Sequence, residues 1–233
     1  MRRQTLWFSL SLGFVILFAL IGTTSAASSS ALLTQDFDQV AVGELPEGWL
    51  PRNGDKKIFE VFEVVEDPTG ARGKVLKQSP GMSGEGYLLT PPIAAHGSEV
   101  TVQFRVRIDA TDGQSGNVGF YLFTEGGQWP PYTSLHLSPI SDQPGRAQLS
   151  AVGTYDGALQ SKVLFALDLG EFHDIALRIN LDDSKYRVSV NGGEWSELLN
   201  FRSPGTSLSP FHLGLYWRED KPVIYWDEIS VSE

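Results

Sequence analysis

Residues 99–108 read Glu-Val-Thr-Val-Gln-Phe-Arg-Val-Arg-Ile, and every second residue in this stretch is apolar. Successive side chains of a β-strand point to opposite faces, so a strand here has one apolar face and one polar face that carries Arg105 and Arg107. In a helix, the same apolar residues would be spread around the whole circumference. The stretch therefore predicts a strand that is buried on one side.

Segments with similar alternation recur up to the C-terminus, separated by turns that contain Gly or Pro. No segment keeps a helical period for three turns, and no repeat with a period of about 20–50 residues is found. The pattern predicts an all-β fold of two packed antiparallel sheets, a jelly roll. The expected strands lie near 34–39, 58–65, 74–78, 86–90, 99–108, 117–124, 133–138, 147–153, 162–167, 173–181, 186–191, 211–217 and 223–231.

The clearest local unit is a hairpin over residues 173–191. Alternating apolar residues lead into and out of the turn at 182–184, which reads Asp-Asp-Ser. The following Asn-Gly-Gly at 191–193 permits the positive φ angles of a tight turn. This unit is expected to form two neighbouring antiparallel strands.

The N-terminal segment has the layout of a secretory signal peptide. Two arginines precede an apolar run over residues 6–21, and small residues follow up to Ala26. The run of about 16 residues is shorter than the roughly 20 that a spanning helix needs, although a retained anchor is the alternative. We expect a signal peptide at 1–26, a flexible lead-in at 27–33 and one jelly-roll domain at 34–233, secreted or periplasmic and without a membrane span after cleavage.

Composition excludes several classes of function. Cleavage after Ala26 would leave 207 residues with 16 basic and 28 acidic side chains, so the chain would be repelled by phosphate backbones and nucleic acid is not expected as a partner. The chain contains no Cys, which excludes disulfides and thiolate metal sites. Stability must then come from packing. The oligomeric state stays open.

Seven short segments, taken in their order along the chain, resemble one superfamily. They are residues 36–38 (Asp-Phe-Asp), 43–49 (Gly-Glu-Leu-Pro-Glu-Gly-Trp), 64–69 (Val-Val-Glu-Asp-Pro-Thr), 73–78 (Gly-Lys-Val-Leu-Lys-Gln), 170–174 (Gly-Glu-Phe-His-Asp), 188–192 (Val-Ser-Val-Asn-Gly) and 225–229 (Tyr-Trp-Asp-Glu-Ile). The series is similar to the concanavalin A-like lectin/glucanase superfamily, and within it to exported bacterial 3-keto-disaccharide hydrolase-like or laminin-G-like jelly-roll domains. The resemblance implies a sandwich whose concave sheet often holds a glycan, and it implies no particular reaction.

Two enzyme mechanisms of this fold can be compared with the sequence. A family 16 glycoside hydrolase needs carboxylates on alternate residues of one strand, whereas the nearest match, residues 228–232, reads Glu-Ile-Ser-Val-Ser. That mechanism is disfavoured. A polysaccharide lyase needs a Tyr or His base beside groups that neutralise a uronate, and a suitable set would be Gln103, Arg105, Tyr121 and His136. The sequence names no catalytic residue and leaves open whether the chain is an enzyme, while an ordinary polar sheet face is the alternative.

The predicted polar sheet face carries groups that suit a carbohydrate. Sugars offer hydroxyls to Arg and Gln side chains and a C–H face to aromatic rings. Trp129 and Tyr132 lie in a Gly- and Pro-rich loop, where binding residues are often found, although packing over the edge of the sandwich is an equal alternative. The expected ligand-binding residues are Gln103, Arg105, Arg107, Tyr121, Trp129, Tyr132, His136, Tyr216 and Arg218.

A structural calcium ion is also expected. The resemblance implies that a calcium ion ties the first strand to the last, and Asp36, Asp38 and Asp227 occupy those two regions of the sequence. Carboxylate oxygens are hard ligands that suit calcium. Carboxylates that simply face water are the alternative.

The sequence therefore predicts a carbohydrate-binding jelly-roll domain that recognises a polysaccharide or surface glycan on its concave sheet. A carbohydrate hydrolase or lyase with Arg105, Tyr121 and His136 in one cleft is the second interpretation. A structural envelope module without a small ligand is the third.

Overall fold

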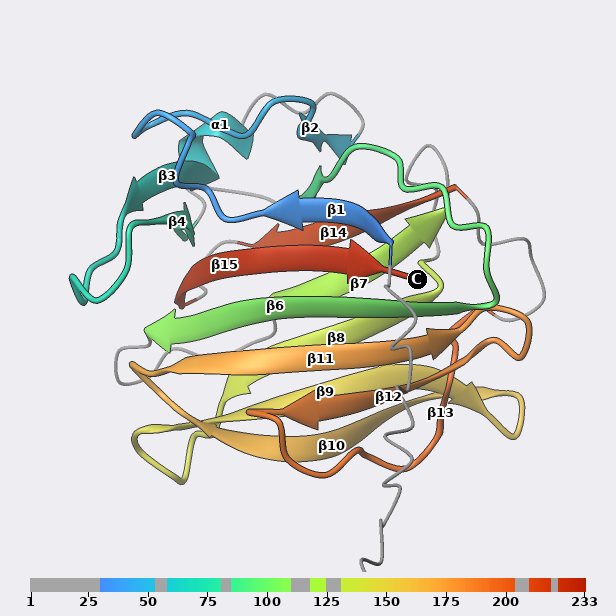
Figure 1. The fold of residues 1–233 in the computed structure, drawn as a ribbon. Helices are drawn as coiled ribbons and strands as arrows, with labels where there is room; N and C mark the ends of the chain where they lie inside the picture. Colours follow the sequence, from blue (N-terminus) through green and yellow to red (C-terminus); the bar gives the residue numbers. More distant parts are fainter. Residues whose placement is uncertain are drawn as a thin grey trace, which may run out of the picture.

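The computed structural model describes residues 30–52, 58–80, 85–109, 118–124, 131–203, 210–218 and 222–233. Within these residues, β-strands make up two antiparallel sheets that pack face to face, with one short helix, α1 (Ile58–Val61), beside them (Figure 1). The chain is a jelly-roll sandwich, and the predicted fold class is confirmed.

The eight-stranded sheet faces the viewer in Figure 1. Along this sheet β1 (Ala31–Gln35) pairs with β15, so the first and last strands of the described chain are neighbours. The sheet order is β13 (Leu199–Asn200), β12 (Lys185–Val190), β11 (Phe172–Asn180), β6 (Glu99–Asp109), β15 (Val223–Ser232), β4 (Lys74–Gln78) and β3 (Phe62–Glu66).

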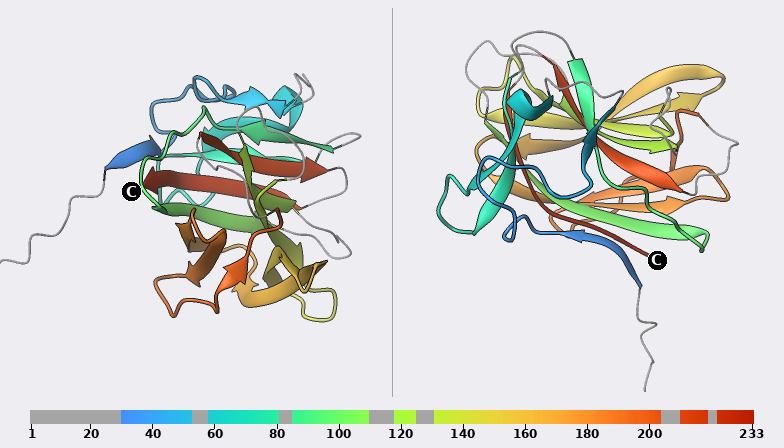
Figure 2. Two further views of the ribbon diagram at one scale, coloured as in Figure 1. Left: turned by 90° about the vertical axis from the view of Figure 1, so that its right-hand side faces the viewer. Right: turned by 90° about the horizontal axis from the view of Figure 1, so that it is seen from above.

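The seven-stranded sheet lies behind the first, and the side view in Figure 2 shows the two layers. Strands β7 to β10 are consecutive in sequence and pair in that order, whereas β14, β5 and β2 come from other parts of the chain. Its order is β10 (Ala158–Asp168), β9 (Arg146–Tyr155), β8 (Thr133–Pro139), β7 (Val118–Thr124), β14 (Phe211–Arg218), β5 (Glu85–Leu89) and β2 (Leu50–Pro51).

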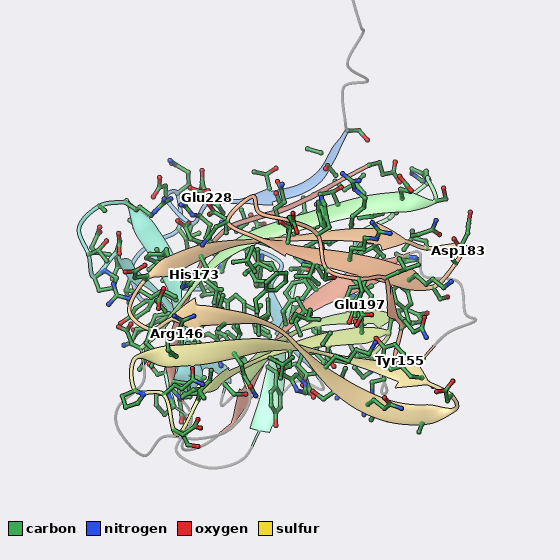
Figure 3. The ribbon with its side chains drawn as sticks, turned by 90° about the horizontal axis from the view of Figure 1, so that it is seen from below. Arg146, Tyr155, His173, Asp183, Glu197 and Glu228 are labelled. Carbon is green, nitrogen blue, oxygen red and sulfur yellow. The ribbon has the colours of Figure 1, made fainter. Side chains whose placement is uncertain are left out.

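Strand β6 supplies the centre of the core. Its five alternate apolar residues are at most 2% exposed. Phe104 stacks on Phe120 of the opposite sheet with ring centroids 4.7 Å apart, and Trp226 of β15 lies 5.6 Å from the same Phe104 ring. Side chains from both sheets fill the space between the layers (Figure 3). The alternation over 99–108 therefore defines both the buried side of β6 and its outward side.

A buried amide links the two sheets. The Gln78 side chain, 1% exposed, donates from Nε2 to the carbonyl oxygen of Tyr216 in the other sheet at 2.9 Å. Its Oε1 accepts the indole N–H of Trp226 at 3.0 Å. A buried polar group is tolerated when its hydrogen bonds are made, and this one uses both ends of the amide.

Several local expectations differ from the structure. Residues 58–65, expected as one strand, form α1 and then β3, because the chain turns before it enters the sheet. Strand β1 begins at Ala31, inside the expected lead-in 27–33, since Leu32 and Leu33 pack against the core. The short strands β2 and β13 were not predicted.

The hairpin at 173–191 is confirmed, with β11 and β12 paired from Ile175 opposite Val190 to Asn180 opposite Lys185. Ser184 and Asn191 take φ angles of 53° and 52°, as the turn positions require. The expected signal peptide falls outside the described residues. None of the helices in the described ranges has the length and hydrophobicity needed to cross a membrane.

Replacing Gln78 by Met should destabilise the protein by about 2–4 kcal/mol, because the change keeps the side-chain volume but removes two buried hydrogen bonds. Urea unfolding monitored by tryptophan fluorescence would measure the loss. A cost below about 0.5 kcal/mol, with an unchanged denaturant slope, would show that the amide link contributes little.

Candidate functional site

The predicted ligand-binding residues lie on two sheets that face away from each other. Gln103, Arg105 and Arg107 belong to β6 of the eight-stranded sheet, whereas Tyr121 and His136 belong to β7 and β8 of the seven-stranded sheet. Alternation along a strand separates its two faces but does not say which sheet the strand joins. The expectation of one shared polar face was therefore wrong, and so was the single cleft that would combine Arg105 with Tyr121 and His136.

Of three other predicted residues, one lies in the core and two have side chains outside the described part of the chain. Tyr132 is 2% exposed and packs in the core, with its ring centroid 6.2 Å from that of Phe201, so the prediction that it binds ligand was wrong. Trp129 lies outside the described residues. Arg218 ends β14, and its side chain is likewise outside the described part.

A groove of about 510 Å³ crosses the outer face of the eight-stranded sheet. Its walls and floor come from β1, β6, β11 and β15, strands that are far apart in sequence. This volume lies within the range of about 300–1,000 Å³ that small-molecule sites occupy. Two of the predicted residues, Gln103 and Arg105, line it.

Four of the residues that line the groove, Ala176, Gln103, Ser230 and Thr34, belong to one register row across the sheet. The registers place Ser189 opposite Ala176, Ala176 opposite Gln103, Gln103 opposite Ser230 and Ser230 opposite Thr34. The row thus runs at right angles to five strands, β12, β11, β6, β15 and β1. Ser189 is 4% exposed and does not line the groove. The other four residues bring one methyl, one amide and two hydroxyl groups to this groove, which we call the trough.

A β-bulge in β15 shapes one wall of this trough. Asp227 pairs with Arg105 and Ser230 with Gln103, so two residues of β15 lie opposite the single Phe104 of β6. Glu228, one of the two, has a φ of 49°, a conformation that is uncommon for a non-glycine residue. The bulge directs Asp227 and Glu228, consecutive in sequence, to the same outer face. Figure 3 shows Glu228 on that outer side.

Two arginines hold this pair of carboxylates. Arg72 Nη1 lies 2.6 Å from Glu228 Oε1 and 3.6 Å from Asp227 Oδ2. Arg105 bridges across the groove wall, with Nη1 at 3.2 Å from Glu228 Oε1 and Nε at 2.5 Å from Asp174 Oδ1. The wall therefore presents fixed charges of both signs toward the trough. Asp174 and Glu228 were not among the predicted site residues, although the break in alternation at 226–229 is a sequence signal for the bulge.

Burial raises the pKa of Asp227 to about 6, and the neighbouring Glu228 carboxylate adds to the effect. The hydrogen bond from the Glu228 N–H at 2.8 Å and the Arg72 charge oppose it. Asp227 is 4% exposed, so its ionised form is poorly solvated. Asp227 thus titrates within two units of neutral pH.

Arg107 lies on the same sheet but is occupied by other partners. Its Nε and Nη2 donate to the two carboxylate oxygens of Asp109 at 2.8 and 3.0 Å, and its guanidinium lies 5.7 Å from the Tyr225 ring centroid. The hydrogen bond to Asp109 raises the Arg107 pKa above its ordinary value. Arg107 does not line the groove.

The expected calcium ligands are engaged within the protein. Asp38 Oδ1 accepts the Lys74 N–H at 2.8 Å, and Asp36 Oδ1 accepts the Asp38 N–H at 3.2 Å. Among the residues that the structure describes, no three His, Asp or Glu side chains are grouped so that they could hold a metal ion. A calcium site formed by Asp36, Asp38 and Asp227 stays a prediction.

The outer face of the seven-stranded sheet has a different character. Aromatic rings gather there, apart from the main core, and Tyr121 lies 5.6 Å from Tyr216 between ring centroids. Tyr121 Oη and His136 Nε2 are 2.8 Å apart. Burial, together with the charge of Arg202, lowers the His136 pKa to about 4, so the imidazole is neutral at pH 7. A phenol and a neutral imidazole in contact form a pair that can pass a proton.

Solved structures similar to this chain share its fold at low sequence identity. A sialidase matches with a TM-score of 0.59 and 13% identity, over 88% of this chain and 19% of that protein, so this chain spans about a fifth of the sialidase. The CBM2 module of the evolved Dit protein of Lactobacillus casei BL23 phage J-1 matches with a TM-score of 0.55 and 16% identity, over 88% of this chain and 95% of the module. An alginate lyase, A1-II′, matches with a TM-score of 0.51 and 13% identity, over 73% and 82% of the two chains.

No protein-family model and no curated protein matches the sequence. At these sequence identities, the structural likeness supports the jelly-roll fold and does not assign a function. The more specific resemblance to 3-keto-disaccharide hydrolase-like domains stays a prediction.

Replacing Asp227 by Asn should remove a pH dependence of stability between about pH 4 and 6. The folded-state pKa of about 6 lies above the unfolded value near 3.8, so the folded state binds more protons in this window and loses roughly 2–3 kcal/mol as pH rises through it. The variant should gain stability relative to the wild type above pH 6 and not below pH 4. Thermal unfolding of both proteins from pH 3.5 to 7.5 would measure the difference.

His136 acts with the opposite sign and explains why the difference between two proteins is needed. Its folded-state pKa of about 4 lies below the ordinary 6.5, so its contribution is complete above pH 6.5 and is lost as pH falls toward 4. The pH dependences that Asp227 and His136 give to the free energy of unfolding overlap and partly cancel in the wild type. Equal curves for the wild type and Asp227→Asn across the whole range would contradict the raised pKa.

Proposed function

We propose that this protein is a secreted or periplasmic carbohydrate-binding jelly-roll domain, and that the trough across the eight-stranded sheet holds a polysaccharide or surface glycan. The observation that carries the proposal is the cross-strand row from Ala176 to Thr34, which lines an open groove of about 510 Å³. Solved structures of the same fold include a CBM2 module, a sialidase and an alginate lyase, and their names support a carbohydrate as the partner.

The chemistry of the trough suits sugar hydroxyls. Gln103 and Ser230 offer both donors and acceptors, and the Asp174 and Glu228 carboxylates accept hydrogen bonds from hydroxyls. Because the arginine bridge fixes these carboxylates in place, a ligand would meet groups that are already oriented. A chain of sugars would lie along the row, across the strands.

Filling the trough should weaken binding without removing a hydrogen-bonding group. Ala176 lies in the row beside Gln103, lines the groove and is half-buried, so Ala176→Phe would fill this part of the trough. We expect binding to a responsive glycan to fall by about 10-fold or more on a glycan array, followed by calorimetry with the best ligand. The array identifies the sugar.

The matched control is Ala166→Phe, the same change at an exposed strand position of the seven-stranded sheet. It should leave affinity within about two-fold. Binding that is unchanged in Ala176→Phe, or equally reduced in both variants, would refute the groove as the site. Replacing Gln103 by Ala should lower affinity by a smaller factor, since it removes one or two hydrogen bonds.

A lyase is the second candidate, favoured by the contact between Tyr121 and His136. Elimination of a uronate needs a base at the acidic C–H and a cation at the carboxylate. His136 is neutral at pH 7 and contacts the Tyr121 hydroxyl, while the Arg202 charge acts on His136 and the Arg52 guanidinium lies 5.4 Å from the Tyr87 ring centroid. This site would lie on the seven-stranded sheet and would not involve Arg105.

Incubation with polyuronates would test this candidate through the absorbance of the unsaturated product. If the pair is catalytic, Tyr121→Phe should lower the rate by about 100-fold or more, within the usual contribution of general acid–base catalysis. Ala176→Phe should leave that rate unchanged. The absence of unsaturated product from every polyuronate would exclude the lyase while leaving the binding proposal intact.

A further inference from the structure

Two arginines face each other across neighbouring strands beside the trough. Arg178 of β11 is the direct register partner of Arg187 of β12, and both side chains are exposed. Directly opposed residues have Cβ atoms about 4.5–5.5 Å apart, and like charges in that position destabilise a sheet. The other cross-strand neighbour of Arg178 is Thr101, which carries no charge.

These cations have no acidic partner in the part of the chain that the structure describes. Arg178, Arg187 and Lys185 form no ion pair within 4 Å there, although Glu99 and Asp183 line the same hollow. By contrast, Arg105 and Arg107 of β6 and Arg72, which lies just before β4, are all paired. The hollow around the unpaired cations has a volume of about 220 Å³.

An exposed aromatic ring borders the cations. Trp195 is 36% exposed, and the Arg178 guanidinium lies 4.9 Å from its ring centroid. A tryptophan face is a good platform for the C–H face of a sugar, and stacking also holds the arginine in place. The ring and the two guanidinium groups together offer both an apolar and a cationic contact.

We propose that Arg178, Arg187, Lys185 and Trp195 form a binding site for the acidic group of a saccharide, a carboxylate or a sulfate. Arg178 and Arg187 lie in the register row next to Ala176 and Ser189, so this site adjoins one wall of the trough. An anion between the two guanidinium groups relieves their repulsion and accepts hydrogen bonds from both. The inference rests on the proposed function in that the glycan chain would extend from the trough onto this site, which makes the ligand an acidic glycan.

The overall charge makes such binding specific to the site. The chain carries 28 acidic and 18 basic side chains, so its general field repels a polyanion. Attraction must then come from a local arrangement of cations. If an acidic polymer binds the protein at moderate salt, it must therefore contact a local basic patch of this kind.

The experiment compares three polymers by calorimetry at one fixed ionic strength: polygalacturonate, dextran sulfate and neutral dextran. The double variant Arg178→Gln/Arg187→Gln should lose about 10-fold or more in affinity for the acidic polymer that the wild type prefers. Trp195→Ala should weaken the same binding. The matched control is Arg146→Gln/Lys162→Gln, which removes two charges that are paired with Asp168 and Glu197. It should change affinity by less than about two-fold.

The carboxylated and sulfated polymers distinguish the two sources of the acidic group. If the double variant and the control lose equal affinity, the loss comes from the change in net charge, and the inference is overturned. It is also overturned if neutral dextran binds as tightly as both acidic polymers. Ala176→Phe separates the two proposals. If it leaves all binding intact while the arginine variant loses it, the trough fails as a site and the acidic-group site stands.

The melting temperature without ligand is a second readout, which distinguishes a binding role of the arginine pair from a purely structural one. Without ligand, Arg187→Gln should raise the melting temperature by roughly 1–3 °C, because it removes a like-charge contact. The same variant should bind the acidic polymer less well. A lower melting temperature in Arg187→Gln would show that the pair is stabilised within the protein and would contradict an open anion site.

Discussion

Most long strands in the described part of this protein bury one of their two faces, because the chain has no cysteine and its stability depends on packing between two sheets. That requirement fixes the register of each strand, since a slip by one residue would turn the buried side chains outward. The contact between Phe104 and Phe120 across the layers is the centre of this packing. Once the inner faces are fixed, the outer side chains of neighbouring strands are fixed too, and they form rows across the sheet.

The trough is a direct consequence of these rows. Ser189, Ala176, Gln103, Ser230 and Thr34 come from five strands that are spread over most of the sequence. Four of them line the trough because the register places them side by side. The bulge after Asp227 keeps the row aligned, since it absorbs one extra residue of β15 between its pairing with Arg105 and with Gln103.

Local patterns allowed the strands and the fold class to be predicted, because alternation and turn residues act over a few positions. The face that each polar residue shares with others depends on sheet order, which is set by long-range pairing, so Arg105 and Tyr121 were wrongly joined. Tyr132 shows the same limit: its loop suggested exposure, but the ring lies in the core beside Phe201. The bulge was foreseeable in principle, because Asp227 and Glu228 interrupt the alternation of β15.

Three features that cost folding free energy lie on the outer face of the eight-stranded sheet. Glu228 takes a positive φ angle, Asp227 is ionised at neutral pH although it is buried, and Arg178 faces Arg187. Each could be removed by one substitution that leaves the core untouched, because none of these side chains packs between the sheets. Local strain and unpaired charge are concentrated where a structure is shaped for something other than its own stability. Since all three border the trough or the row beside it, we place the proposed binding site on this face of the sandwich.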